Sequence, residues 1–123
     1  MRYGIALSLF LLALPVTASD LVNSVPTRFL GSWSSSPDAC GTGTDDLVLE
    51  LKPDRISHWE SSGPLKSIVL HGQDEIALIA ELSDEGHTWL TAAVFRLSPE
   101  GDKLIDATSG DEVVRYRCPD SSK

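Results

Sequence analysis

The most suggestive pair of polar residues in the chain is His58 and Glu60, which lie two positions apart. Residues two apart on a strand share a face, so this imidazole and carboxylate could form a general base or supply two metal ligands. In the alternative arrangement Trp59 faces the interior, and His58 and Glu60 are solvated. We favour this alternative, because no third ligand and no nucleophile can be named from the sequence. We therefore predict no catalytic residue, no metal site and no cofactor.

The residues after this pair extend it into a candidate binding site. Ser61 and Ser62 precede Gly63 and Pro64, and their hydroxyl groups offer hydrogen bonds to a ligand. The segment lacks the strand, Gly-x-Ser-x-Gly and helix succession of a nucleophile elbow, so it reads as a turn that closes a hairpin. The candidate binding residues are His58, Trp59, Glu60, Ser61 and Ser62.

The first 18 residues have the pattern of a secretory signal peptide. Arg2 supplies a positive start, an apolar run follows, and small residues precede a cleavage site after Ala18 or, as the next candidate, Ser19. An uncleaved membrane anchor is the alternative, but the apolar run is short for a span. No cysteine lies at the cleavage site, so a lipoprotein is not indicated. We predict export, either to the periplasm or outside the cell.

Cys40 and Cys118 are the only two cysteines of the chain. An even number of cysteines in a small exported domain is typical of a disulfide, which here would close a loop of about 80 residues. Two free or metal-binding thiols are the alternative, but there is no Cys-x-x-Cys pair and no histidine at a zinc-ligand spacing. We predict a disulfide between Cys40 and Cys118.

The charge and length of the chain restrict its partners and organisation. The 123 residues carry a net charge of −8, and removal of residues 1–18 leaves 18 acidic and 9 basic residues. An acidic chain lacks the basic surface that nucleic-acid binding requires. Nothing after residue 18 is apolar for long enough to span a bilayer. The rest is long enough for one domain, which we expect to be monomeric.

The mature chain reads as short strands separated by turns, without a convincing helix. In residues 75–82 every second residue is apolar, at 76, 78, 80 and 82, which share one face, while residues 75, 77, 79 and 81 form the other. Turn sequences such as Ser83-Asp84-Glu85-Gly86 separate the strands. We predict an all-β fold, an antiparallel meander of about eight strands closed into a small barrel. The expected organisation is a flexible leader at 19–27, a single β-barrel domain at 28–118 and a flexible tail at 119–123.

The predicted disulfide conflicts with a simple barrel of this kind. The first and last strands would be antiparallel neighbours, which places Cys118 near the start of the first strand, whereas Cys40 follows its end. The two Cα atoms must lie within about 7 Å of each other. Either the segment from Ser35 to Thr44 folds back along the barrel, or one of the eight strands is not a strand.

Gly31-Ser32-Trp33, at the start of the first predicted strand, resembles the opening of lipocalin-like barrels. In that superfamily the tryptophan closes one end of the barrel and an arginine of the last strand often packs across it. The resemblance implies a barrel plug formed by Trp33 with Arg115 and Arg117. Short exported inhibitors of bacterial metalloproteases have a similar opening, although their second cysteine comes earlier than Cys118.

The first functional hypothesis is therefore a small exported lipocalin-like barrel that binds a partner without catalysis. The partner is a small apolar molecule in the barrel or a basic protein on a rim loop. The long segment from Ser34 to Asp46 is where we expect a partner to make contact. The alternative is an inhibitor of an exported hydrolase, either a protease or a lysozyme. A hydrolase that uses His58 and Glu60 is the least favoured hypothesis.

Overall fold

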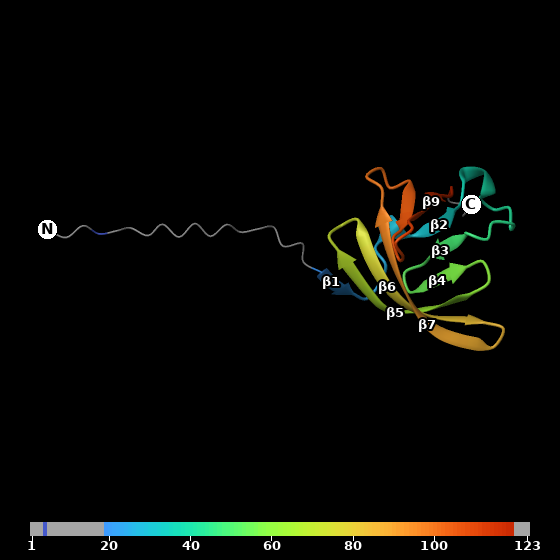
Figure 1. Cartoon of the computed structure of the whole chain (residues 1–123), viewed down its shortest axis with the longest axis horizontal. Coiled ribbons are helices and arrows are strands. Elements are labelled where there is room, and N and C mark those ends of the chain that lie inside the picture. Colours follow the sequence, from blue (N-terminus) through green and yellow to red (C-terminus); the bar gives the residue numbers. More distant parts are fainter. Residues whose placement is uncertain (1–3, 5–18, 120–123) are drawn as a thin grey trace.

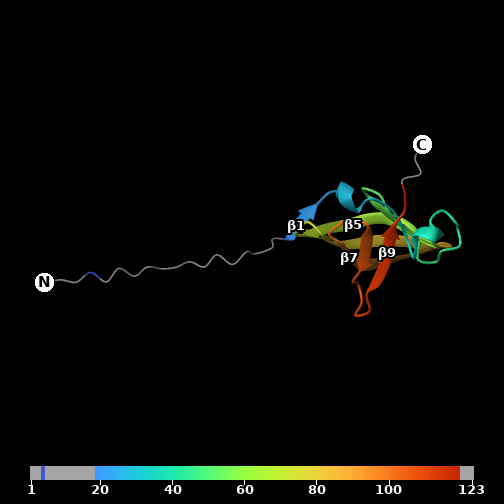
Figure 2. The ribbon, with the colours of Figure 1, turned by 90° about the horizontal axis from the view of Figure 1, so that it is seen from above.

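A computed structural model describes residue 4 and residues 19–119 of the chain. These residues form an all-β structure with two short 3-10 helices (Figures 1 and 2). The strands are β1 (Ser19–Val22), β2 (Gly31–Ser34), β3 (Leu49–Leu51), β4 (Arg55–His58), β5 (Ser62–His71), β6 (Glu75–Asp84), β7 (His87–Leu97), β8 (Lys103–Asp106) and β9 (Val113–Arg117). The helices are η1 (Thr27–Phe29) and η2 (Pro37–Ala39).

Strands β2 to β9 form a closed antiparallel barrel of eight strands, as predicted. Each strand pairs with the next along the chain, and the pairing of β9 with β2 closes the barrel. The alternation predicted in β6 sets its orientation: its apolar residues at 76, 78, 80 and 82 are buried, whereas Ile79 is 44% exposed. A shift of one residue would turn this apolar row to the outside, so the pattern determines the register.

The segment before the barrel contains a ninth strand, where the sequence analysis expected a flexible leader. β1 pairs with the C-terminal half of β5, from Ser19 opposite His71 to Val22 opposite Ile68. β5 can accept this strand because β4 pairs only with the first residues of β5, from Ser62 to Pro64. Apart from residue 4, the predicted signal peptide lies outside the described residues, and so do residues 120–123 of the predicted tail.

The core fills most of the barrel interior with large apolar side chains. Trp33 and Phe29 are fully buried at the end where the chain enters the barrel, and Phe95 is fully buried on β7. The other buried apolar residues are Val25, Leu49, Leu51, Ile56, Ile68, Ile76, Leu78, Ala80, Leu82, Leu97 and Leu104.

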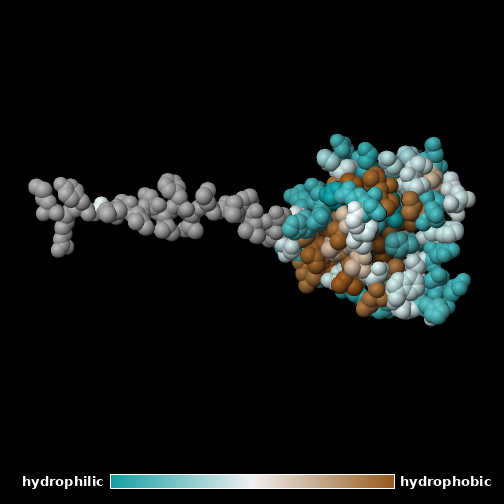
Figure 3. Space-filling model, in the orientation of Figure 1, coloured by the Kyte–Doolittle hydropathy of each residue, from teal (hydrophilic) through white to brown (hydrophobic). Residues whose placement is uncertain are grey.

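The outer surface also carries apolar side chains. Leu21, Ile79 and Leu90 are exposed on β1, β6 and β7. In Figure 3 brown side chains gather over the part of the barrel that these strands occupy in Figure 1. No helix in the described part of the chain has the length and apolar character needed to cross a bilayer.

Gly63, on β5, lies in close contact with the backbone of β6. A Cβ atom at this position would lie only 1.7 Å from the backbone oxygen of Glu81. We expect Gly63→Ala to lower the free energy of unfolding by at least about 2 kcal/mol, because backbone must move to relieve the clash. Urea unfolding measures the change. Gly110→Ala is the control, since its Cβ would meet no atom within 4 Å, and equal losses for the two variants would contradict the prediction.

Candidate functional site

The loop between β2 and β3 carries the disulfide and resolves the conflict over its geometry. Cys40 and Cys118 are bonded, with their Cα atoms 5.6 Å apart. Cys118 continues β9 alongside β2, where its backbone N–H donates to Ser32 at 2.8 Å. After Ser34 the chain turns back through η2 and brings Cys40 to Cys118. The first alternative therefore holds: the loop folds back, and all eight predicted strands are present.

Asp45 closes the base of this loop, a role that the sequence analysis missed. One of its carboxylate oxygens accepts the backbone N–H of Ser35 at 2.8 Å, and the other accepts that of Leu47 at 3.1 Å. Partial burial opposes ionisation, but these hydrogen bonds and the charge of Arg115 lower the pKa of Asp45 below its usual value. The loop is thus held at its base by a carboxylate and in its middle by a disulfide.

The outer part of the loop is exposed. Pro37, Asp38 and residues 41–44 and 46 face solvent. The loop, drawn in teal to green, projects from the barrel in both Figure 1 and Figure 2. A groove of about 510 Å³ runs between the loop and the barrel. Its lining residues are Ser32, Ser34, Pro37, Cys40, Gly41, Val48, Cys118 and Pro119.

Trp33 and Arg117, two of the three residues expected in a barrel plug, lie in contact. The guanidinium carbon of Arg117 lies 4.2 Å from the centre of the Trp33 ring, a cation–π distance. The Trp33 indole N–H donates to the backbone oxygen of Phe29 at 3.2 Å. Burial lowers the pKa of Arg117. Its three nitrogens donate to the backbone oxygens of Gly101, Leu30 and Arg28 at 2.9, 2.7 and 2.6 Å.

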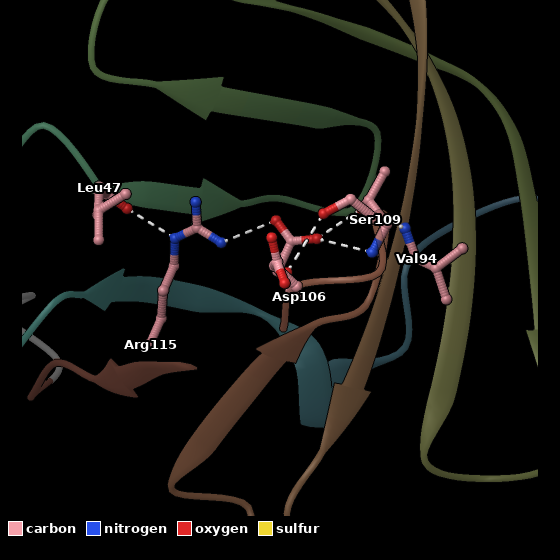
Figure 4. Close-up of polar contacts among 7 residues, drawn as sticks. Leu47, Val94, Asp106, Ser109 and Arg115 are labelled. Atoms are coloured by element: carbon pink, nitrogen blue, oxygen red, sulfur yellow. Dashed lines mark hydrogen bonds and ion pairs between the residues drawn. The ribbon is translucent and has the colours of Figure 1, made fainter. Parts of the chain in front are cut away.

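Arg115 lies elsewhere, so its predicted place in the plug was wrong. Arg115 is buried and donates to the backbone oxygen of Leu47 at 2.7 Å and to the Asp106 carboxylate at 3.1 Å (Figure 4). Successive inward-facing residues of a strand lie at different heights in the barrel, so Arg115 and Arg117 reach different neighbours. Arg115 ties β9 to the loop before β3 and to the end of β8.

Asp106 and Thr108 continue this polar chain to β7. Thr108 donates its backbone N–H and its hydroxyl to Asp106, at 3.1 and 2.5 Å, and the Val94 backbone N–H donates to the Thr108 hydroxyl at 3.0 Å. Burial opposes ionisation of Asp106, but the hydrogen bonds from Thr108 and Arg115 and the charge of Arg115 lower its pKa. Asp106 is therefore an ionised carboxylate, and both of its oxygens accept hydrogen bonds. The sequence held one signal for this inward-facing group. Asp106 lies two positions after Leu104 on β8, so the two side chains point to the same face of the strand.

His58 borders a small cavity at the same end of the barrel. The cavity measures about 200 Å³ and its lining is mainly apolar. Burial and the nearby charge of Arg115 lower the pKa of His58, while Asp106 acts in the opposite direction. No described residue forms a hydrogen bond with the imidazole ring. The other lining residues are Ile56, Leu78, Ala80, Leu82, Thr91, Ala92, Ala93, Phe95, Asp106 and Thr108.

Neither arrangement considered for His58 and Glu60 occurs. The two residues do not share a strand face, and the favoured alternative, with Trp59 facing the interior, was wrong. β4 ends at His58, whose backbone N–H donates to Ser61 at 2.7 Å in a tight turn. Glu60 and Trp59 lie on this turn and face solvent, and Trp59 is 53% exposed. The two-residue spacing holds only within a strand, so Glu60 leaves the face that His58 keeps.

The five candidate binding residues nevertheless lie together around one shallow depression. Its volume is about 360 Å³, and Ser57 and Ser83 complete its lining. Ser61 and Ser62 are half-buried there, and Ser62 pairs with Ser83 across β5 and β6. Within residue 4 and residues 19–119, no group of three or more histidine, cysteine or acidic residues is arranged to hold a metal ion.

The fold and these surfaces define a class of protein: a small, closed eight-stranded antiparallel barrel with one disulfide that holds an exposed rim loop. Comparison with protein-family models, with curated proteins and with solved structures finds no match to this chain.

Proposed function

We propose that this protein is an exported, non-catalytic binding protein that docks on a basic protein through the rim loop, defined as residues 35–46. The observation that carries this proposal is the construction of the loop. It projects from the barrel, yet the Cys40–Cys118 bond and the two hydrogen bonds to Asp45 hold it in one shape. A loop that is already ordered loses little conformational entropy when it binds.

The charge of the rim loop supports a basic partner. No lysine or arginine occurs between Arg28 and Lys52, whereas Asp38 and Asp46 are exposed on the loop. The whole chain adds a net charge of −8. Complementary charge accelerates association and disfavours acidic competitors.

Inhibition of an exported hydrolase is the second candidate function. The same observation favours it, because a stapled loop that projects from a barrel can enter the active-site cleft of an enzyme. Binding of a large apolar ligand inside the barrel has less support, since the cavity beside His58 measures about 200 Å³ and drug-sized ligands occupy about 300–1,000 Å³.

The test is a pull-down from the exported fraction of the source organism, with three versions of the mature protein as bait. The loop variant is Asp38→Lys/Asp46→Lys. The matched control, Asp74→Lys/Glu100→Lys, changes the net charge equally on two other exposed turns. We expect the wild type and the control to capture the same basic protein, and the loop variant to capture at least about tenfold less.

Equal capture of that protein by the loop variant would refute docking through the rim loop. Assays of the captured protein for protease and lysozyme activity, with and without added wild type, separate the two candidate functions. Loss of activity on addition identifies an inhibitor, and unchanged activity identifies a binding protein.

A further inference from the structure

One part of the barrel wall has an open strand edge. β7 pairs with β6 over its whole length, from His87 opposite Asp84 to Arg96 opposite Glu75. On the other side of β7, β8 pairs only with residues 95–97. Hydrogen bonds of the Val94 backbone with Ala107 and Thr108 extend this contact by one residue. The N-terminal half of β7, residues 88–93, therefore has no neighbour on the β8 side among the described residues. In Figure 1 this end of the β6–β7 hairpin projects at the lower right.

The hydrogen-bonding direction of β7 shows which backbone groups face this edge. The N–H of Leu97 donates to Asp74, towards β6, whereas Ser98 donates to Lys103, towards β8. Because backbone groups alternate in direction along a strand, Thr88, Leu90 and Ala92 point their N–H and C=O groups to the open side. None of these groups has a backbone partner in the described part of the chain. They form a ready template for another strand.

The cavity beside His58 lies directly along the open edge. Thr91 and Ala93 of β7 line it on one side, and Asp106, the last residue of β8, lines it on another. The cavity exists where β8 stops, because no strand continues the wall there. An added strand would occupy this missing position, and its alternate side chains would point into the cavity. Apolar residues of β4 and β6 would then contact them.

We propose that the open edge of β7 binds an extended peptide segment of a partner protein by β-strand addition. Main-chain hydrogen bonds to Leu90 and Ala92 would provide affinity, and one apolar peptide side chain in the cavity would provide specificity. The imidazole of His58, which has no hydrogen-bond partner among residues 19–119, can bond to the peptide. Neither lysine nor proline, the residues that commonly protect an edge, occurs in residues 87–93.

Charge identifies the kind of peptide. The tip of the hairpin carries Asp84 and Glu85, and neither forms an ion pair with a described residue. Trp89, opposite Leu82 in the same hairpin, is 41% exposed and offers an aromatic face to a cation. A peptide that alternates apolar with other residues and carries lysine or arginine near one end fits this edge. A second copy of the chain fits poorly, because two chains of charge −8 would bring two acidic tips together.

The test uses a display library of random peptides of about six residues, enough to pair with residues 88–93 of the open edge. Two variants accompany the wild type. Ala92→Pro removes an N–H from the open side only, and proline is tolerated on edge strands. Ala93→Leu fills the cavity and leaves the edge intact. Ile79→Ser, on the outer face of β6, is the control, and circular dichroism confirms that each variant is folded.

We expect the library to yield alternating apolar peptides with a basic residue. Ala92→Pro and Ala93→Leu should each weaken their binding at least about tenfold, and the control Ile79→Ser should not. Bound peptide should slow hydrogen exchange of the Leu90 and Ala92 amides. The proposal would be overturned if Ala92→Pro and Ala93→Leu bound the peptides as well as the wild type, or if the library yielded no enriched peptide. It would also be overturned if bound peptide slowed hydrogen exchange at β1 instead of β7, or if exchange at β7 slowed with rising protein concentration in the absence of peptide. The rim-loop variant Asp38→Lys/Asp46→Lys should bind these peptides normally, so failure here is distinct from failure of the proposed function.

Discussion

Replacement of Trp33 by alanine is expected to lower the free energy of unfolding by about 4 kcal/mol. The Trp33 side chain is fully buried, and its loss leaves a cavity at the closed end of the barrel. The same change removes the ring under Arg117 and leaves the backbone oxygen of Phe29 without the indole N–H. Unsatisfied polar groups add to the cost of the cavity.

Urea unfolding followed by far-ultraviolet circular dichroism measures this loss. Trp59→Ala is the matched control, because Trp59 is 53% exposed and its removal should change the free energy by less than about 1 kcal/mol. Arg117→Met separates the two parts of the effect, since it keeps the buried tryptophan but removes the cation. Similar small losses for Trp33→Ala and Trp59→Ala would show that the plug does not stabilise the barrel.

Removal of the disulfide in Cys40→Ser/Cys118→Ser should destabilise the protein by about 4 kcal/mol in the chain-entropy model. The bond spans 78 residues, so it restricts a large part of the unfolded chain. Within the folded state it is also the covalent link that holds the middle of the rim loop against β9. The variant should therefore lose stability and expose the loop to proteases.

Thermal unfolding and limited proteolysis with peptide mapping measure the two effects. We expect cleavage within residues 35–46 of the variant under conditions in which the wild type stays intact. Wild type treated with a reductant is the control and should behave like the double variant. Unchanged stability together with an intact loop would contradict the prediction and would assign the ordering of the loop to Asp45 alone.

The strands of the barrel could be predicted because their pattern is local. Apolar residues at every second position of β6, bounded by turn sequences, specify a half-buried strand with a defined face. β1 could not be predicted in this way, because residues 19–22 have no such alternation and become a strand only through pairing with β5. The space for that pairing depends on the short length of β4, which is a property of the assembled sheet.

The candidate site likewise combines features that the sequence predicts with features that depend on tertiary contacts. The proximity of residues 57–62 and a place for His58 on a strand followed from the sequence, but Glu60 left that strand face because a turn hydrogen bond to Ser61 ends β4 at His58. The partners of Arg115, Asp45 and Asp106 come from distant segments. Their contacts depend on the stagger of strands around the barrel, which no local pattern records.

By itself, the sequence determined the all-β class, the eight strands of the barrel and the pairing of its two cysteines. Alternation and turn residues are local patterns that specify strands, and two cysteines allow only one intramolecular disulfide. Only the tertiary structure decided that the rim loop folds back, that Arg117 rather than Arg115 covers Trp33, and that β7 extends beyond the end of β8. The physical reason is that these features depend on strand lengths and stagger, which are set when all strands pack around one core.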